Sequence, residues 1–281
     1  MKQYQDLLKH ILEKGTRHQD RTGVGTISVF GYQTRFDLRE EFPIVTTKRV
    51  PFRWIVEELL WFLQGSTDER ELRARGVDIW AEWADAEHTA KFDRNDGDLG
   101  PVYGYLWRNF GGDYPEKNGF DQIAWLINEI KTNPNSRRLI VSGWDPKNAA
   151  QVELPPCHTL FAFKVENEKI LHCQLFQRSA DAFLGVPFNI SSYALLTHLI
   201  AHVCDLEVGE FVHTFNDLHI YSNHLKQVEE LLQREPLPLP KLEFVGVENF
   251  KGLTGLLNIK YENLSLQNYQ SHGKIAAPVA V

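Results

Sequence analysis

Two strand-like segments near the middle of the chain are too close together to be joined by anything but a short turn. The segments TLFAFKV (159–165) and KILHCQLFQRS (169–179) are rich in aromatic and β-branched residues, which is typical of strands. Parallel neighbours need a crossover of about a dozen residues or more, so a gap of hairpin length predicts an antiparallel pair. Further strands are expected at 26–38, with Gly31 as a bulge, and at 137–144 and 210–217. A wholly parallel sheet is therefore disfavoured.

Helical patterns precede, separate and follow these strands. Apolar residues repeat at helical spacing in residues 4–12, and Gly15 follows as a stop signal. Helices are also expected at 53–65, 120–134, 189–206 and 222–234, of which 189–206 is apolar enough to be buried. No internal repeat and no Gly/Ser-rich linker divides the chain. We therefore predict an α/β (α+β) fold with a single domain over residues 1–281.

The balance of charge excludes some functions. The chain carries 30 Lys and Arg against 37 Asp and Glu, a formal net charge of −7. This argues against a protein that coats nucleic acid, although a local arginine cluster could still hold one phosphate group. The three cysteines lack metal-ligand spacing, so we expect no disulfide scaffold, no metal site and a reducing cytoplasm. Residues 1–15 lack the apolar core of a signal peptide and no long apolar run occurs, so neither export nor a membrane span is expected.

Cys157 follows two prolines in the segment VELPPCHTLF, directly before a strand. Taken alone it is most simply a small buried residue, because free cysteine commonly packs as a hydrophobe. A nucleophilic cysteine needs helpers, since only the thiolate is reactive and an ordinary thiol is mostly protonated at neutral pH. The adjacent His158 is poorly placed to help, because neighbouring residues of a strand point to opposite faces.

Four arginines stand at the ends of predicted elements, where binding sites concentrate. Arg21 lies in the turn DRTG, Arg137 and Arg138 open a strand, and Arg178 ends one. A planar guanidinium can hold a phosphate with two hydrogen bonds. Each arginine alone is equally well explained as a solvated loop residue.

Two polar side chains on predicted helices have both a structural and a functional explanation. Asn189 stands where a helix begins and could cap it, or its amide donor and acceptor could read the O4 and N3–H edge of a uracil. Glu58 lies on the apolar face of its helix. It is either a helix-surface carboxylate or a buried acid with a raised pKa.

Ring-bearing residues offer further candidates. His219 and Tyr221 alternate along one side of a strand, so they could contact one ligand or pack as a core pair. The segment between 65 and 119 has little periodicity, and long irregular stretches of compact chains are often functional. Within it, Trp80 and Trp83 either anchor the loop or offer surfaces on which a planar ring could stack.

Taken in order, many short motifs of the chain resemble those of one family. They are DRTGVGT, FPIVTTKR, EELLWFLQG, IWAEWAD, DGDLGPVYG, NPNSRRLIVSGW, LPPCH, QLFQRSADAFLGVPFNISSYALL, CDLEVGEF, DLHIYSNH and APVAV. Over essentially the whole chain they are similar to the folate-dependent thymidylate synthases that use a cysteine nucleophile. The resemblance implies a three-layer domain with a mixed, largely antiparallel sheet. It also implies a homodimer in which two sheets pack back to back.

The implied activity is reductive methylation of dUMP to dTMP with 5,10-methylenetetrahydrofolate as co-substrate and no metal. Cys157 would add to C6 of the uracil, and Glu58 with bound water would move protons. The other catalytic positions would be Arg178, Asn189, Asp181 and Tyr103. The dUMP contacts would be Arg21, Gln177, Arg178, Ser179, Asp181, Asn189, His219 and Tyr221, with Arg137 and Arg138 reaching across from the partner subunit. The folate contacts would be Trp80, Trp83, Leu154, Asp181, Gly185, Phe188 and Val281.

Some positions depart from the family pattern. Asn216 stands where the family usually has Gly, Ala162 where Gln is common, and Tyr105 and Leu106 replace a more polar pair. The tail SHGKIAAPVAV lacks the usual His-Pro pattern, which bears on how the C-terminus would close over the site.

Three other functions stay open on the sequence. A dUMP or dCMP hydroxymethylase of the same family would use Cys157 and let water finish the reaction. Against it, Asn189 disfavours cytosine, because an acidic residue would pair better with the amino group, and Trp80 favours the reductive outcome. A Cys-His hydrolase would use Cys157 with His158. A non-catalytic nucleotide-binding or RNA-binding regulator would bind without turnover, and the acidic net charge does not indicate RNA binding.

Overall fold

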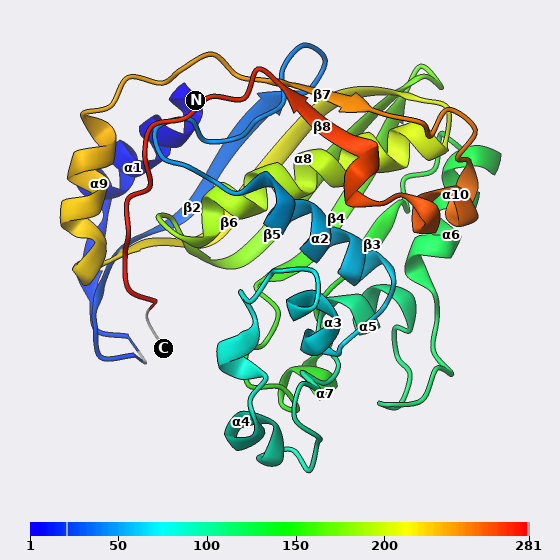
Figure 1. Cartoon of the computed structure of the whole chain (residues 1–281), viewed down its shortest axis with the longest axis horizontal. Helices are drawn as coiled ribbons and strands as arrows, with labels where there is room; N and C mark the ends of the chain where they lie inside the picture. The colour runs from blue at the N-terminus through cyan, green and yellow to red at the C-terminus, as the bar shows by residue number, and fades with distance from the viewer. Residues whose placement is uncertain (21, 280–281) are drawn as a thin grey trace.

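The main sheet is mixed and largely antiparallel, as the sequence predicts. The computed structural model describes residues 1–20 and 22–279. The strands of the main sheet are β1 (Thr16–His18), β2 (Thr26–Asp37), β3 (Ile140–Ser142), β4 (His158–Glu166), β5 (Ile170–Asp181) and β6 (Glu207–Tyr221). Their order is β1-β2-β6-β5-β4-β3, and among these described strands β5 and β6 alone pair in parallel (Figure 1). A separate antiparallel pair joins β7 (Lys241–Phe244) to β8 (Leu264–Gln267).

A buried helix lies against the sheet and forms the middle of three layers. This helix, α8 (Gly185–Val203), packs on β5 and β6 with one side, and α2 (Phe52–Leu63) and α10 (Gly252–Asn258) cover its other side (Figure 1). A helix that is apolar all round has to be covered on every side, which explains this position. The other helices are α1 (Lys2–Lys14), α3 (Glu69–Arg73), α4 (Ala86–Ala90), α5 (Tyr103–Arg108), α6 (Gln122–Thr132), α7 (Pro146–Ala149) and α9 (Leu225–Leu232). Single 3₁₀ turns are η1 (Ala81–Trp83), η2 (Ser222–His224) and η3 (Tyr261–Asn263).

The three central strands change their buried face at one level. In β2 the buried positions are 27 and 29 before Gly31 and 34 and 36 after it. The same change of parity occurs after residue 215 in β6 and after residue 177 in β5, so the β2–β6 register continues unbroken. Gly31 adopts φ +73°, which only glycine takes up without strain. The bulge predicted at Gly31 is therefore wrong, because β2 has no extra residue; Gly31 instead marks a local kink shared by three strands.

This kink explains how the chain accommodates Asn216. The pairs Phe30–Asp217 and Tyr32–Phe215 flank it on the β2 side, so Asn216 lies opposite Gly31. On the β5 side it lies at the level of Arg178, between two regularly paired positions. The departure from glycine therefore leaves the strand pairing intact on both sides of β6.

Element boundaries differ from the sequence-based expectation in three places. The strand expected at 137–144 is shorter, because only Ile140–Ser142 pair with β4. The strand expected at 210–217 extends over Glu207–Tyr221, because β2 and β5 hold it on both sides. The helix expected from residue 189 begins four residues earlier, at Gly185.

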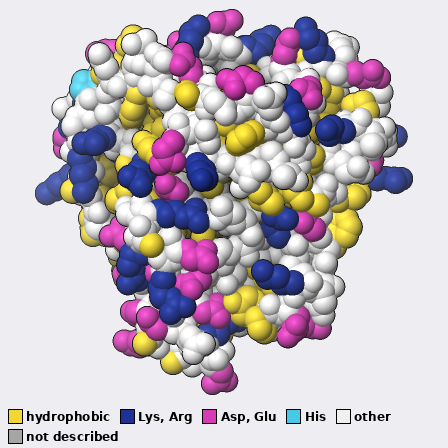
Figure 2. All heavy atoms as spheres, turned by 45° about the vertical axis from the view of Figure 1, so that its right-hand side comes forward, with side chains coloured by type: hydrophobic (Ala, Val, Ile, Leu, Met, Phe, Trp, Pro, Cys, Tyr) yellow, Lys and Arg dark blue, Asp and Glu magenta, His cyan; other side chains and the backbone are white. Residues whose placement is uncertain are grey.

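The surface and the helices set limits on partners. On the face shown in Figure 2, acidic and basic side chains are interspersed and do not gather by sign. Among residues 1–20 and 22–279, none of the helices combines the length and apolarity needed to cross a bilayer. The same residues contain no group of His, Cys, Asp and Glu side chains arranged to hold a metal ion.

Candidate active site

Arg178 holds the turn that carries Cys157. Its Nε donates to the carbonyl oxygen of Pro156 and its Nη2 to that of Pro155, both at 2.8 Å, while its backbone N–H donates to the Cys157 carbonyl at 2.8 Å. The guanidinium also lies over the Trp144 ring, 5.2 Å from the centroid. The two prolines cannot donate from their own nitrogens, so their carbonyls are the groups through which Arg178 fixes the turn. The side chain thus couples the end of β5 to the start of β4.

Tyr103 supports the same turn from α5. Its hydroxyl oxygen accepts the backbone N–H of Cys157 at 2.7 Å and that of His158 at 3.3 Å. Tyr103 is 5% exposed, and its ring lies 4.9 Å from that of His158. Burial raises the pKa of Tyr103 far above its ordinary value, so the hydroxyl keeps its proton. That proton is not used by either backbone amide, which leaves the hydroxyl able to donate.

The Cys157 thiol is half-buried and mostly protonated at rest. Burial raises the pKa of Cys157, and the nearby Arg178 charge offsets only part of that rise. Sγ lies 3.9 Å from the carbonyl oxygen of Pro155. Arg178 therefore acts in the expected direction on the thiol without making it a resting thiolate.

A line of polar side chains runs from His158 into the core. Gln177 Nε2 donates to Asn189 Oδ1 at 3.1 Å, and the His158 ring also hydrogen-bonds the Asn189 side chain. Burial lowers the pKa of His158 to about 4, with the Asn189 hydrogen bond opposing that shift, so the imidazole is neutral near pH 7. Gln177 Oε1 in turn lies 2.8 Å from His213 Nε2. Asn189 is thus held by its hydrogen bonds with Gln177 and His158.

The helix-cap explanation of Asn189 is wrong. Because α8 begins at Gly185, Asn189 lies inside the helix, and the N-cap position belongs to Leu184. A β-carbon built on Gly185 would lie 3.6 Å from Asn189 Oδ1, so the glycine passes close to this amide. The Asn189 side chain therefore does not cap the helix, and Gln177 and His158 hold it instead.

Glu58 projects from α2 toward the irregular segment. Its Oε1 accepts the indole N–H of Trp80 at 2.7 Å. Burial raises the pKa of Glu58 to about 7, with the Trp80 hydrogen bond opposing that rise. The Trp80 ring lies 6.1 Å from that of Tyr103, so the carboxyl group and the Cys157 turn are connected through two aromatic side chains.

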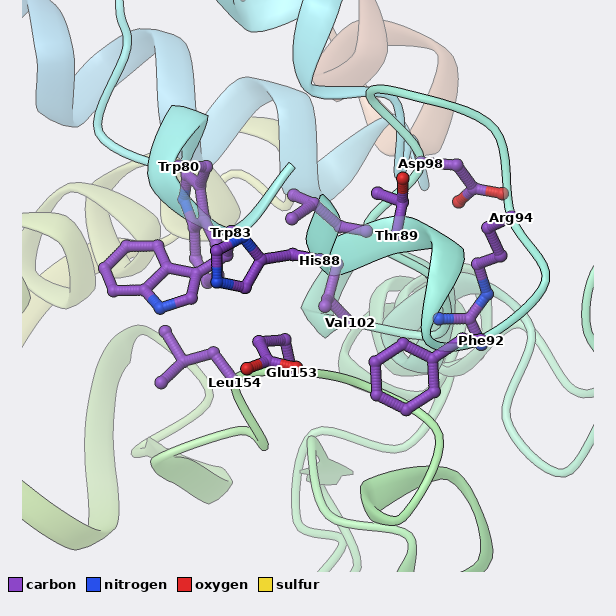
Figure 3. A pocket seen from close by; sticks show the side chains of 11 residues that line it. Trp80, Trp83, His88, Thr89, Phe92, Arg94, Asp98, Val102, Glu153 and Leu154 are labelled. Carbon is purple, nitrogen blue, oxygen red and sulfur yellow. The ribbon is translucent and has the colours of Figure 1, made fainter. Parts of the chain in front are cut away.

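Aromatic and apolar side chains line a pocket beside Trp80. Trp83 and Leu154 lie near Trp80 at one end, and Phe92 and Arg94 lie at the other (Figure 3). Its full lining is Trp80, Trp83, His88, Thr89, Phe92, Arg94, Asp98, Leu99, Val102, Glu153 and Leu154. Three residues that the family resemblance assigned to folate, Trp80, Trp83 and Leu154, therefore line the same pocket. Leu154 lies three residues before Cys157 in the chain.

Asp181 lies at the end of β5 and is held as a carboxylate. Its Oδ1 accepts the backbone N–H groups of Phe183 at 2.9 Å and Leu184 at 3.2 Å, and it lies 3.8 Å from His224 Nδ1. Burial opposes ionisation, but the nearby His224 ring and the hydrogen bonds from the two amides outweigh it and lower the pKa of Asp181. His224 Nε2 also lies 2.8 Å from the carbonyl oxygen of Pro278, so it ties Asp181 to the C-terminal tail.

The ribose candidates stand next to Asp181 across the sheet. His219 pairs with Asp181 between β6 and β5, and its Nδ1 lies 2.6 Å from Asp217 Oδ1. The Tyr221 ring lies 5.0 Å from that of His219 and 5.6 Å from that of His224. Ser179 lies two residues before Asp181 on β5, and Phe188 packs half-buried in the second turn of α8.

Two predicted residues, Arg137 and Arg138, are not joined to this cluster. Both are exposed before β3, and among the described residues no side-chain hydrogen bond links them to the Cys157 turn. The predictions for Arg21 and Val281 fall outside the described residues. Among residues 1–20 and 22–279, Arg178 is therefore the arginine that lies beside Cys157.

Sequence reasoning missed two residues of this arrangement. His158 was set aside because it points away from Cys157, yet its ring contacts Tyr103 and its hydrogen bond holds Asn189. His224, within the motif DLHIYSNH, was not singled out, although it joins Asp181 to the tail. For His158 and His224 alike, the signal available in the sequence was a histidine close to candidate polar residues.

A family model described as thymidylate synthase matches residues 2–281, which is essentially the whole chain. The motifs that carry Cys157, Tyr103, Arg178 and Asn189 all fall within that match. The protein therefore belongs to the thymidylate synthase family, whose members are methyltransferases of nucleotide biosynthesis.

Proposed function

We propose that the protein is a thymidylate synthase that methylates dUMP to dTMP and converts 5,10-methylenetetrahydrofolate to dihydrofolate. The observation that carries this proposal is the single connected cluster in which Cys157, Tyr103, His158 and Asn189 adjoin Glu58 through Trp80. Addition to a pyrimidine ring requires a thiol as nucleophile, an amide that hydrogen-bonds the base, and an acid that exchanges protons near neutral pH. Cys157, Asn189 and Glu58, whose pKa is about 7, supply these groups.

In the proposed reaction the Cys157 sulfur forms a bond to C6 of the uracil, which makes C5 nucleophilic. The raised resting pKa of the thiol is compatible with this role if the proton leaves as the nucleotide binds. Glu58 exchanges protons on the C5 and O4 side, and its pKa of about 7 lets it both accept and donate near neutral pH. The Tyr103 hydroxyl, whose oxygen already accepts two backbone amides, assists proton removal.

The nucleotide would be held along β5 and β6. Asn189 reads the uracil edge, Gln177 orients it, and Asp181 stands beside them. His219 and Tyr221 hold the ribose, and Arg178 and Ser179 hold the phosphate together with Arg21 and the partner's Arg137 and Arg138. Two N–H groups of Arg178 are engaged by proline carbonyls, and a guanidinium has five, so donors remain for phosphate.

The folate co-substrate would lie against the residues that line the pocket beside Trp80. The pocket walls combine two indole rings with Leu154 and Val102, which suits a planar ring system. The folate supplies the one-carbon unit and the hydride. Asp181, ionised and oriented by two backbone amides, offers an acceptor for ring N–H groups, and Gly185 and Phe188 lie one helical turn further on. Val281 would close the site as part of the tail that His224 already holds at Pro278.

Two identical chains would form the complete enzyme. Phe30 is 87% exposed, Ile140 47% and Leu160 38%, and all three lie on the sheet face opposite α8. Large apolar side chains exposed on one sheet face indicate an interface. Arg137 and Arg138 lie three and two residues before Ile140, so pairing of these faces would carry them to the partner's site. We propose a single-domain homodimer that works in the cytoplasm.

The Cys-His hydrolase is the least supported alternative. The His158 ring lies against Tyr103 and Tyr193 and hydrogen-bonds Asn189, while the Cys157 sulfur contacts the carbonyl oxygen of Pro155. A neutral imidazole with a pKa of about 4 is a weak base for a thiol. The geometry therefore favours His158 as a support for Asn189.

An assay of dihydrofolate formation with dUMP tests the proposal. The parent should produce dihydrofolate and dTMP, Cys157→Ser should lose the dUMP-dependent signal, and Cys204→Ser should retain it as a control on a cysteine remote from the site. A 5-hydroxymethyl product in place of dTMP would make the protein a hydroxymethylase. Nucleotide binding by parent and Cys157→Ser without turnover in either would make it a binding protein.

A further inference from the structure

His213 is fully buried on β6 and makes a polar contact with Gln177. It is 0% exposed, and its ring lies 3.8 Å from that of Phe215 and 5.4 Å from that of Phe211. Nε2 lies 2.8 Å from Gln177 Oε1, whereas Nδ1 has no hydrogen-bond partner among the described residues. A buried polar atom without a hydrogen bond costs stability, so this histidine needs an explanation beyond packing.

A backbone carbonyl fixes the direction of every hydrogen bond in this line. Gln177 Nε2 lies 3.0 Å from the carbonyl oxygen of Ser179, which can only accept. The amide nitrogen of Gln177 must therefore face Ser179 and, at 3.1 Å, Asn189 Oδ1. Gln177 Oε1 must face His213, so His213 donates from Nε2. Burial lowers the pKa of His213 well below its ordinary value, so the ring is neutral and its proton is on Nε2.

The line ends at Asn189 with its amide oriented. Asn189 Oδ1 accepts from Gln177 Nε2 over 3.1 Å, so the oxygen of the amide is engaged by Gln177. The Nδ2 of Asn189, a donor, is the group that remains for a ligand.

We propose that His213 is a positioning residue that acts through Gln177 to hold Asn189 with its N–H donor toward the pyrimidine, and so selects a 4-oxo over a 4-amino base. This inference rests on the proposed function, because it concerns the nucleotide that the Cys157 site takes. An N–H donor pairs with the oxygen at C4 of uracil, whereas the amino group of cytosine would face it donor to donor. Without His213, Gln177 Oε1 loses its hydrogen-bond donor, and the amides of Gln177 and Asn189 are held less firmly.

The test compares binding of dUMP, dCMP and 2-deoxyribose 5-phosphate, the last of which carries no base. In the parent, dUMP should bind more tightly than dCMP. His213→Phe, which keeps a planar ring but no donor, should lower the ratio of the dCMP to the dUMP dissociation constant roughly tenfold, the size of one lost hydrogen bond. His213→Gln places an amide N–H the same number of bonds from the backbone, so it should restore most of the ratio.

Two controls separate positioning from a general packing defect. His198→Phe replaces another histidine of the interior, whose Nε2 lacks a partner among the described residues, and should leave the ratio unchanged. Binding of 2-deoxyribose 5-phosphate should be the same in parent and His213→Phe. An equal loss for all three ligands, or a preserved ratio in His213→Phe, would overturn the inference and leave the proposed function standing. A parent that does not prefer dUMP would reject both.

A direct measurement covers the case in which His213→Phe does not fold. Nitrogen-15 NMR of labelled histidine in the parent should show His213 neutral with its proton on Nε2 at neutral pH, assigned by loss of the signal in His213→Gln. A proton on Nδ1, or a charged ring, would reverse the hydrogen bond to Gln177 and reject the inference.

Discussion

The indole N–H of Trp80 donates to Glu58 Oε1 over 2.7 Å and thereby joins helix α2 to the irregular segment between 65 and 119. The contact gives each partner what its burial requires. The buried indole finds an acceptor, and the carboxyl group keeps one hydrogen bond while burial raises its pKa to about 7. Burial therefore raises the pKa of the proposed acid, and the hydrogen bond from Trp80 limits that rise.

Glu58→Gln should change how stability depends on pH. The folded-state pKa of about 7 lies above the ordinary 4.5, so the stabilising effect of the protonated form is complete below about pH 4.5 and is lost as the pH rises through about 7. Gln keeps an oxygen for Trp80 without a charge. The variant should exceed the parent by on the order of 2 kcal/mol in unfolding free energy at pH 8 and match it at pH 4.

Chemical denaturation across this pH range gives the answer. Glu229→Gln, an exposed carboxylate on α9, serves as the matched control and should follow the parent at every pH. Parallel curves for Glu58→Gln and the parent would show that Glu58 titrates at its ordinary pKa in the folded protein.

The strands and helices were largely predictable because their patterns are local. The hairpin of β4 and β5 and the buried helix α8 both follow from short segments read alone. The change of buried face in β5 and β6 was not predictable, since it depends on three strands bending together at one level. Tertiary pairing also set the true lengths of β3 and β6.

The site was predictable in its residues but less so in their contacts. Cys157, Arg178 and Asn189 came from motif resemblance, and nothing local indicated that Arg178 binds the carbonyls of Pro155 and Pro156. The hydrogen bond from Arg178 to Pro156 joins β5 to a turn 22 residues earlier in the chain, so no local hydrophobic pattern in the sequence predicts it. The helix-cap explanation of Asn189 was wrong because α8 begins at Gly185, four residues before Asn189.

Tyr103→Phe should destabilise the protein and disturb the Cys157 turn. The change removes the oxygen that accepts the backbone N–H groups of Cys157 and His158, leaving buried donors without a partner at a cost of about 1–3 kcal/mol. Turnover should fall at least tenfold. Tyr105→Phe on the same helix removes a hydroxyl that donates to Glu116 and should cost about 1 kcal/mol while keeping turnover.

Denaturation and steady-state rates of both variants test this pair. Equal losses of turnover in the two variants would show that any defect in α5 slows the reaction, and would remove the special role given to the Tyr103 hydroxyl.

Arg178→Met should raise the pKa of the Cys157 thiol further. Burial already raises that pKa, and the Arg178 charge is the factor that opposes the rise. Alkylation of Cys157 by iodoacetamide should therefore have its midpoint at higher pH, with a rate at pH 8 several-fold below that of the parent. Arg178→Lys keeps the charge but not the paired bonds to the prolines, so its midpoint should lie between the two.

Mass spectrometry of the alkylated peptides separates Cys157 from the buried Cys173 and Cys204. An unchanged midpoint in Arg178→Met would mean that the guanidinium acts on the turn alone and contributes nothing to the thiol.

Phe30→Asp should convert a dimer into monomers and weaken dUMP binding together. Phe30 is 87% exposed on the open face of the sheet, and a carboxylate there would be buried without a partner if two such faces packed. The proposed phosphate site needs Arg137 and Arg138 of a second chain, so separation should weaken dUMP binding at least tenfold. Val245→Asp changes an exposed apolar residue just after β7, away from that face, and should preserve both properties. Analytical ultracentrifugation with parallel dUMP titrations gives both readouts, and a parent that sediments at 32.4 kDa while binding dUMP tightly would show that one chain completes the site.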